Sequence, residues 1–196
     1  MRIVTHPEIV ASPHAELCSR VITLLGQEYV PTHIVLDSSD YTQDHNVIDE
    51  FRDVAFTWTR DRPSQRVPFY YAEITRNPTC THLVWLSQKA LSYSERLFVW
   101  VLAHELRHVY QSRQRFPRDE IRREVQRLRR KPSYAHLLSS LFAPEEIDSE
   151  LSALRVVGAL YGVDEMNAFL VLNPLPRCPC PAYTNLLQEA ATTVQL

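Results

Sequence analysis

Seven consecutive apolar residues fill positions 97–103, with charged or polar residues on both sides. Ahead of the run, Ser92 and Glu95 have the S-x-x-E spacing of a capping box, which predicts that a helix begins near residue 93. Apolar residues at 106, 109 and 110 continue the pattern beyond the run. A helix that is apolar around its whole circumference is a buried one. The pattern therefore predicts a core helix that extends to about residue 110.

Short runs rich in branched and aromatic residues predict strands at 33–37, 54–59, 68–75 and 82–87. An amphipathic helix is predicted over residues 13–29, ahead of the first of these strands. Strands and helices of this kind predict an α+β fold in which a small β-sheet packs on the core helix.

A second helix is predicted from Pro144 to about Tyr161, because proline suits the first position of a helix and Gly162 is a typical stop signal. Glu150 falls near the middle of its apolar face, and Glu146 lies on the flank of that face one turn earlier. The apolar face consists of Ile147, Leu151, Leu154, Val157 and Tyr161.

The acidic residues of this helix can be explained either by the helix dipole or by metal binding. Carboxylates in a first turn offset the helix dipole, which explains Glu146 without any metal. Glu150 is explained less well in this way, because it lies past the first turn among apolar neighbours. Asp148 is predicted to point to the opposite side of the helix, which disfavours it as a ligand.

The strongest chemical signal is the sequence His-Glu-Leu-Arg-His at residues 104–108. On a helix, His104 and His108 lie one turn apart on the same face, where two imidazoles can grip one tetrahedral Zn²⁺. Glu105 can reach a water on that metal as a general base. A core helix with two histidines that only pack is the alternative, and it is disfavoured because buried polar side chains need partners.

An HExxH motif followed by an acidic helix resembles the gluzincin metallopeptidases, whose second helix bears E-x-x-x-D. Residues 146–150 match that pattern with two departures, since Ser149 replaces a small alanine and Glu150 replaces the aspartate. The resemblance covers residues 80–160. Among the small gluzincins, the chain is similar in style to the ImmA/IrrE-like and SprT-like proteins. It implies a zincin-like fold, with the sheet packed on the HExxH helix and on a second, ligand-bearing helix.

The resemblance also implies a zinc-dependent metallopeptidase that acts on a peptide or protein substrate. Zn²⁺ would be held by His104, His108 and Glu146, with Glu105 as the catalytic base. The longer Glu150 would either orient a histidine or replace Glu146 as the third ligand.

Two further parts of such a site can be sought in the sequence. The predicted strand at 82–87 could pair with an extended peptide by edge addition. Another group usually stabilises the oxyanion, and the sequence offers four candidates: Tyr110, His82, Tyr134 and His136.

Two other classes of function remain open. The protein could bind zinc without catalysis and act as a sensor or binding protein. It could also be a nucleic-acid-associated protease that uses the arginine-rich segment 118–131 as a basic patch. A solvated helix is the favoured reading of that segment, with outward arginines and three core residues: Ile121, Val125 and Leu128.

Length and composition suit one domain over residues 1–175 and a tail at 176–196 that contains proline and cysteine. Cys178 and Cys180 are predicted to be incidental, because no second pair completes a metal site with them. A net charge of −2 gives no pull toward nucleic acid or an anionic membrane. Without a signal-peptide pattern or an apolar stretch of spanning length, we expect a cytoplasmic protein and no membrane partner.

Overall fold

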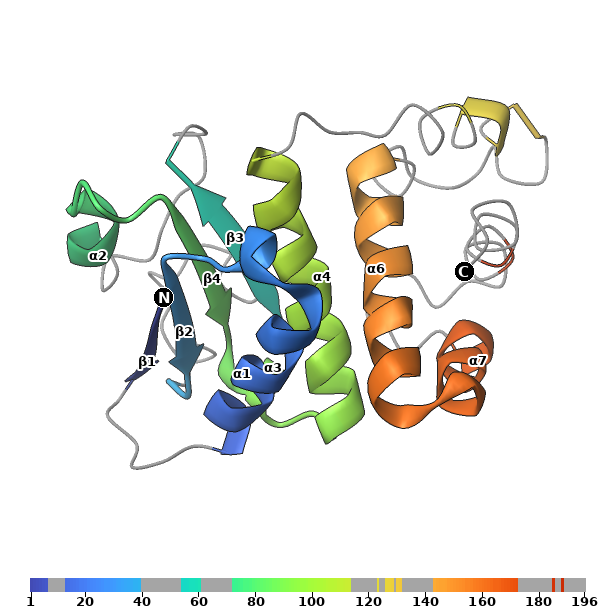
Figure 1. Ribbon diagram of the computed structural model, residues 1–196, viewed down its shortest axis with the longest axis horizontal. Helices are drawn as coiled ribbons and strands as arrows, with labels where there is room; N and C mark the ends of the chain where they lie inside the picture. The colour runs from blue at the N-terminus through green and yellow to red at the C-terminus, as the bar shows by residue number, and fades with distance from the viewer. Residues whose placement is uncertain are drawn as a thin grey trace. The chain divides into compact units, whose positions relative to one another are not determined.

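The computed structural model describes residues 1–6, 13–39, 54–60, 72–113, 123, 126–128, 130–131, 143–172, 185 and 188. The chain forms two compact units, residues 1–113 and 114–196, which we call the N-terminal and the C-terminal unit. The N-terminal unit holds a β-sheet and the helix with the HELRH sequence, and the C-terminal unit holds the acidic helix (Figure 1). The domain predicted at 1–175 spans both units.

A four-stranded mixed sheet forms the centre of the N-terminal unit, in the order β1-β2-β4-β3. β1 (Arg2–His6) pairs in parallel with β2 (His33–Asp37), and β2 pairs in parallel with β4 (His82–Leu86). β3 (Ala55–Thr59) pairs with β4 in the antiparallel direction. The predictions of β2, β3 and β4 are confirmed. β1 is not predicted by the pattern, because polar residues surround its apolar pair at 3–4.

One face of the sheet carries α3 (Gln88–Leu91) and α4 (Glu95–Arg113), which confirms the predicted α+β fold. Figure 1 shows both helices on the same side of the sheet. His82 at the start of β4 reaches the end of α4, where its Nε2 lies 2.8 Å from Ser112 Oγ. Strand alternation places a layer of buried side chains beneath these helices, namely Ile34, Leu36, Val84, Leu86 and Ala55.

The opposite face of the sheet has its own apolar cluster. Its buried members are Val35, Trp58, Cys80, Leu83 and Trp85, and Ile74 from α2 (Ala72–Arg76) packs against them. The strand predicted at 68–75 is therefore wrong where the structure describes it, because residues 72–75 are helical and turn one side chain into this cluster. Residues 68–71 lie outside the described part of the chain.

The first predicted helix is shorter than expected. α1 covers Pro13–Leu25, and a single 3-10 turn, η1, covers Gln27–Tyr29. Gly26 separates them with a φ of 92°, a conformation that favours glycine and that an α-helix cannot continue through. Arg113 at the end of α4 donates to three carbonyl oxygens of this turn and its neighbour: Gln27 at 3.4 Å, Glu28 at 3.3 Å and Val30 at 2.8 Å.

The start of α4 differs from the predicted capping box. Ser94 is the capping residue, since its Oγ accepts from Leu97 N at 3.4 Å and its carbonyl accepts from Phe98 N at 2.9 Å. Ser92 instead ends α3, where its N–H donates to carbonyls of that helix. The box prediction is wrong because Ser92 already serves the preceding helix. The predicted core helix itself is confirmed over Glu95–Arg113.

The C-terminal unit contains α6 (Pro144–Tyr161) and α7 (Val163–Leu172), which pack against each other. The prediction for α6 is confirmed, including its end at Gly162, whose φ is 101°. Gly158 lets the two helices approach closely, because a Cβ there would lie 3.2 Å from Met166 Sδ.

The burial of α6 is broader than its apolar face. Every residue from 147 to 154 is buried, including Glu150 at 3% exposure. Asp148 was placed by the sequence on the side opposite the apolar face, and the structure buries that side as well.

Of the arginine-rich segment 118–131, the structure describes residues 123, 126–128 and 130–131. Leu128 is buried and Arg127 is exposed. This is the pattern predicted for a solvated helix that packs Leu128 on the core and directs its arginines outward. Residues 121 and 125 lie outside the described part of the chain.

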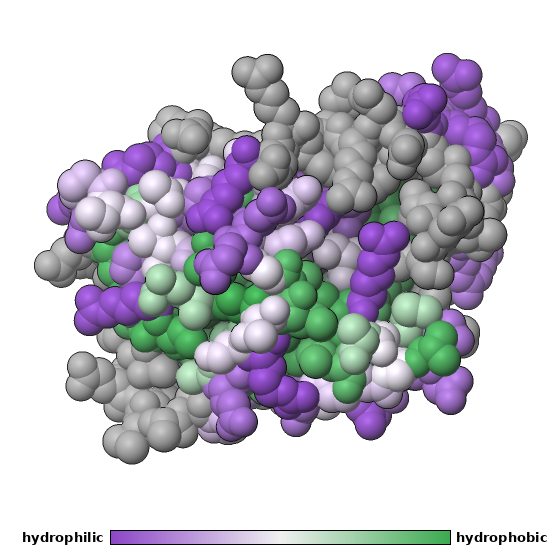
Figure 2. Space-filling model, viewed as in Figure 1, coloured by the Kyte–Doolittle hydropathy of each residue, from purple (hydrophilic) through white to green (hydrophobic). Residues whose placement is uncertain are grey.

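The surface of the described residues contains both hydrophilic and hydrophobic side chains. Hydrophilic side chains form several separate groups on the face shown in Figure 2. Within the described ranges, no helix has the length and apolar character that a membrane crossing requires.

Candidate metal centre

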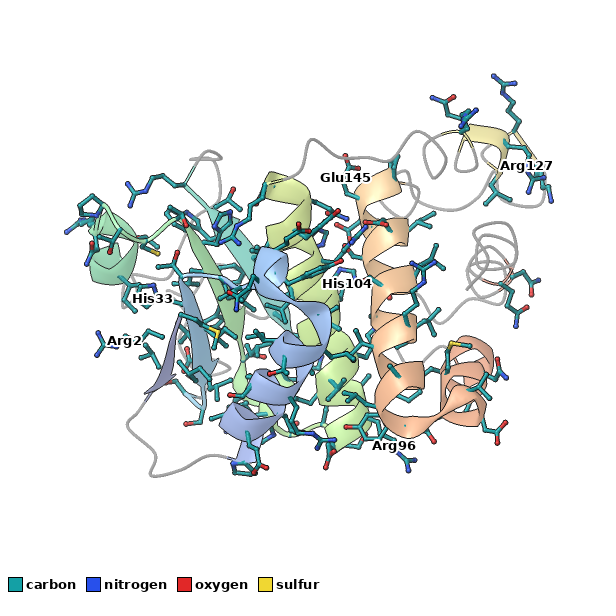
Figure 3. All side chains as sticks on the ribbon, viewed as in Figure 1. Arg2, His33, Arg96, His104, Arg127 and Glu145 are labelled. Carbon is teal, nitrogen blue, oxygen red and sulfur yellow. The ribbon has the colours of Figure 1, made fainter. Side chains whose placement is uncertain are left out.

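His104 lies halfway along α4 (Figure 3), and His108 follows one helical turn later. Their rings meet edge to face with centroids 4.9 Å apart, and their Nε2 atoms are 3.2 Å apart. Two nitrogens bound to one tetrahedral zinc, each about 2.0–2.1 Å from the ion, lie about 3.3 Å from each other. The two imidazoles are therefore already spaced as ligands of a single ion.

Gln111 determines which nitrogen of His108 carries the proton. Gln111 Oε1 lies 2.8 Å from His108 Nδ1, so the Nδ1–H donates to the amide oxygen. A neutral His108 then has no proton on Nε2, and that nitrogen can accept from His104 Nε2–H or bind a metal. Metal binding would release the proton that the two rings share.

Glu105 is buried, at 3% exposure, and its carboxylate reaches β3. Thr57 Oγ1 lies 2.8 Å from Glu105 Oε2 and 2.8 Å from the main-chain oxygen of Glu105. Both oxygens are acceptors, so the single hydroxyl proton of Thr57 serves one or the other at a time. The contact holds the carboxylate against the sheet at the level of the histidine pair.

Arg107 turns away from the histidine pair toward η1. Its guanidinium donates to the Tyr29 hydroxyl and lies 4.3 Å from the centroid of the Tyr110 ring. The rings of Tyr29 and Tyr110 stack with centroids 4.8 Å apart. A buried guanidinium beside aromatic rings is favourable, so this cluster stabilises the packing of α4 against η1. Tyr110, one of the four oxyanion candidates, belongs to this cluster.

His82, another oxyanion candidate, has structural partners at both ring nitrogens. Its Nε2 contacts Ser112 Oγ at 2.8 Å, and its Nδ1 contacts Thr81 Oγ1 at 2.9 Å. These bonds join the start of β4 to the end of α4. The remaining two candidates, Tyr134 and His136, lie outside the described residues.

Among the strands that the structure describes, β3 is the edge of the sheet beside the histidine pair. The prediction that residues 82–87 could pair with a peptide is wrong, because β4 has β2 on one side and β3 on the other. Arg60 N donates to Thr81 O, and Ser87 N donates to the carbonyl of Val54. Main-chain groups alternate in an antiparallel pair, so the odd-numbered residues 55, 57 and 59 direct theirs away from β4.

The acidic candidates lie on α6, in the C-terminal unit. Glu146 is half-buried, and Glu150 is buried. His104 and His108 offer two imidazole nitrogens and Glu146 offers a carboxylate oxygen, which are donor types that bind metal ions. Two nitrogens and one carboxylate oxygen are a ligand set that zinc accepts while one coordination position stays open.

Two residues of the site escaped the sequence analysis. Gln111 lies three residues after His108, which places it on the same side of the helix, so helical spacing alone could have identified it. Thr57 comes from a strand 48 residues before Glu105. No local spacing connects these two positions, and only the pairing of β3 with the sheet brings them together.

No protein-family model, curated protein or solved structure matches this chain. The function must therefore be argued from the residues of the site.

Proposed function

We propose that this protein is a zinc-dependent metallopeptidase that uses Glu105 as its general base. The spacing of the His104 and His108 Nε2 atoms, 3.2 Å, is the observation that carries the proposal. The neighbouring carboxylate of Glu105 and the hydrogen bond that sets the protonation of His108 give further support. Two histidines that only hydrogen-bond to each other would not need a buried carboxylate beside them.

Glu146 on α6 is the third ligand in this proposal. Its chemistry completes a donor set of two histidines and one carboxylate, and the resemblance to gluzincins assigns the same role to it. Glu150, one turn further along the same helix, would then orient a ligand by hydrogen bonding.

A zinc ion held by these residues would polarise the substrate carbonyl and increase the acidity of a water beside it. Glu105 accepts a proton from the attacking water as the water oxygen bonds to the carbonyl carbon. The carbon–nitrogen bond of the peptide then breaks, and Glu105 passes the same proton to the leaving nitrogen. The second proton of the water passes from the new carboxylic acid to the amine, so the products are a carboxylate and an ammonium group, and Glu105 returns to its ionised state.

An extended peptide is the substrate form that the N-terminal unit favours. The outward main-chain groups at 55, 57 and 59 can add one more strand to β3. Thr57 contacts Glu105, so a peptide paired there would pass beside the catalytic base. We expect cleavage of unfolded or loop-presented segments in preference to compact domains.

The first test combines zinc content with hydrolysis of an unfolded protein such as casein. We expect about one zinc per wild-type chain, and loss of zinc in His104→Ala. Glu105→Gln should keep its zinc and lose hydrolysis, because an amide cannot accept the proton from water. Glu95→Gln is the matched control, since Glu95 lies on the same helix and is exposed.

The remaining outcomes separate the alternatives. Hydrolysis by Glu105→Gln at the wild-type rate would refute the mechanism. A zinc-loaded wild type with no turnover on any peptide or protein would identify a zinc-binding sensor instead of an enzyme. Zinc lost in Glu146→Ala and kept in Glu150→Ala would identify the third ligand, and the reverse pattern would transfer that role to Glu150.

A further inference from the structure

Thr57 links the proposed catalytic base to the edge of the sheet. It sits in the middle of β3, is 7% exposed, and directs its hydroxyl to Glu105 Oε2 at 2.8 Å. Water has little access to replace this bond if the hydroxyl is removed, because both partners are buried. Removal would leave a buried carboxylate oxygen without this donor.

The hydrogen bond makes the two oxygens of Glu105 inequivalent. While the hydroxyl proton of Thr57 is on Oε2 and not on the main-chain oxygen, it restrains the carboxylate plane about its last torsion, which is otherwise a soft one. A base whose orientation is fixed before substrate arrives needs no reorganisation during the reaction.

The main chain of Thr57 faces a different partner from its side chain. By the alternation described above, its N–H and C=O point away from β4, toward the position of an added strand. A peptide paired with β3 would thus bond to the same residue that holds Glu105. The register of the substrate and the direction of the base are set at one position of the chain.

We propose that Thr57 is a positioning residue that aligns Glu105 for proton transfer and ties that alignment to a peptide docked on β3. The inference rests on the metallopeptidase function proposed above.

The test compares Thr57→Val with Thr57→Ser in the zinc-loaded protein. Valine keeps the shape and removes the hydroxyl, whereas serine keeps the hydroxyl. We expect kcat on an unfolded protein to fall about 10- to 100-fold in Thr57→Val with KM and zinc content near the wild-type values. Thr57→Ser should recover most of the lost kcat.

Thr59→Val is the matched control. Thr59 lies on the same strand and the same face, it is also 7% exposed, and its hydroxyl has no hydrogen-bond partner among the described residues. The two valine variants therefore change volume and strand propensity equally, and only Thr57→Val removes a bond to Glu105. Equal losses of kcat in both valine variants would overturn the proposal, as would wild-type kcat in Thr57→Val.

Crystal structures of the wild type and of both Thr57 variants give a second readout that does not depend on activity. We expect one conformation of the Glu105 carboxylate in the wild type and in Thr57→Ser, and a rotated or multiple conformation in Thr57→Val. An unchanged carboxylate in Thr57→Val would overturn the proposal even if the wild type hydrolyses no peptide. An inactive wild type by itself would refute the proposed function, and the crystal structures would still decide the role of Thr57.

Discussion

Replacing Gln111 with methionine should weaken zinc binding while leaving both histidines in place. Gln111 Oε1 accepts from His108 Nδ1 at 2.8 Å, and the side chain is 7% exposed, so water cannot substitute freely for the lost acceptor. Methionine has a similar length and shape, and its sulfur is a poor acceptor. The change therefore isolates one hydrogen bond.

The size of the effect follows from the difference between the metal-free and metal-bound states. A neutral hydrogen bond contributes about 0.5–1.5 kcal/mol, and a bond to a charged group contributes about 1.5–3 kcal/mol. A metal on Nε2 draws positive charge onto the ring, so the Nδ1–H bond moves from the first class toward the second. The difference of about 1.4 kcal/mol corresponds to a dissociation constant about tenfold higher in Gln111→Met.

A competition titration against a chromophoric zinc chelator at neutral pH measures this change directly. Gln111→Glu should bind zinc at least as tightly as the wild type, because a carboxylate is the stronger acceptor. Gln88→Met is the control, since Gln88 is exposed at the start of α3. Wild-type affinity in Gln111→Met would refute the reasoning, because it would mean that the hydrogen bond does not support a metal-binding tautomer of His108.

Three further predictions concern the rest of the N-terminal unit. Arg113→Ala should lower the free energy of unfolding in urea by about 1 kcal/mol, because the guanidinium no longer holds the carbonyls around η1; an unchanged midpoint would contradict this. Burial and the nearby charges of Arg2 and the N-terminus lower the pKa of His33, so the folded state disfavours its protonation and stability falls as pH drops below about 6.5. The melting temperature between pH 7.5 and 5 should therefore fall less in His33→Gln than in the wild type, and equal slopes would exclude His33 as a contributor. Burial raises the pKa of Cys18 to about 12, so iodoacetamide at pH 8 should leave Cys18 unmodified in the native protein and label it after unfolding, as peptide mapping by mass spectrometry can show.

The elements with strong local signals were predictable from the sequence. The run at 97–103 and the HELRH sequence after it place two histidines on one side of a buried helix, and α4 has that form. Pro144 and Gly162 delimit α6 because proline and glycine act through their own backbone restrictions, which no distant contact needs to support. α7 and β1 were missed because their apolar residues do not recur at a clear period within so few positions.

Features that depend on long-range pairing were not predictable. β4 was expected at an edge of the sheet, but it lies inside the sheet between β2 and β3. The residues at 82–87 contain no signal that identifies the neighbouring strands. The contact between Thr57 and Glu105 depends on that same order. The predicted capping box at Ser92 was wrong for a related reason. Ser92 and Ser94 are both near the start of α4, and because Ser92 ends α3, Ser94 is the residue that caps α4.

The position of β3 has a consequence for how the protein is made. β3 precedes β4 in the chain and pairs with no other strand among the described residues, so it can join the sheet only after β4 has been synthesised. α4 can form from local contacts as soon as its own residues are available. The carboxylate of Glu105 therefore acquires its alignment only when β3 closes the sheet, and a nascent or partly opened chain has a helical HELRH segment without an aligned base. An edge strand is also among the first segments to open in a folded protein, so hydrogen exchange at residues 55–59 should report how often the folded protein loses that alignment.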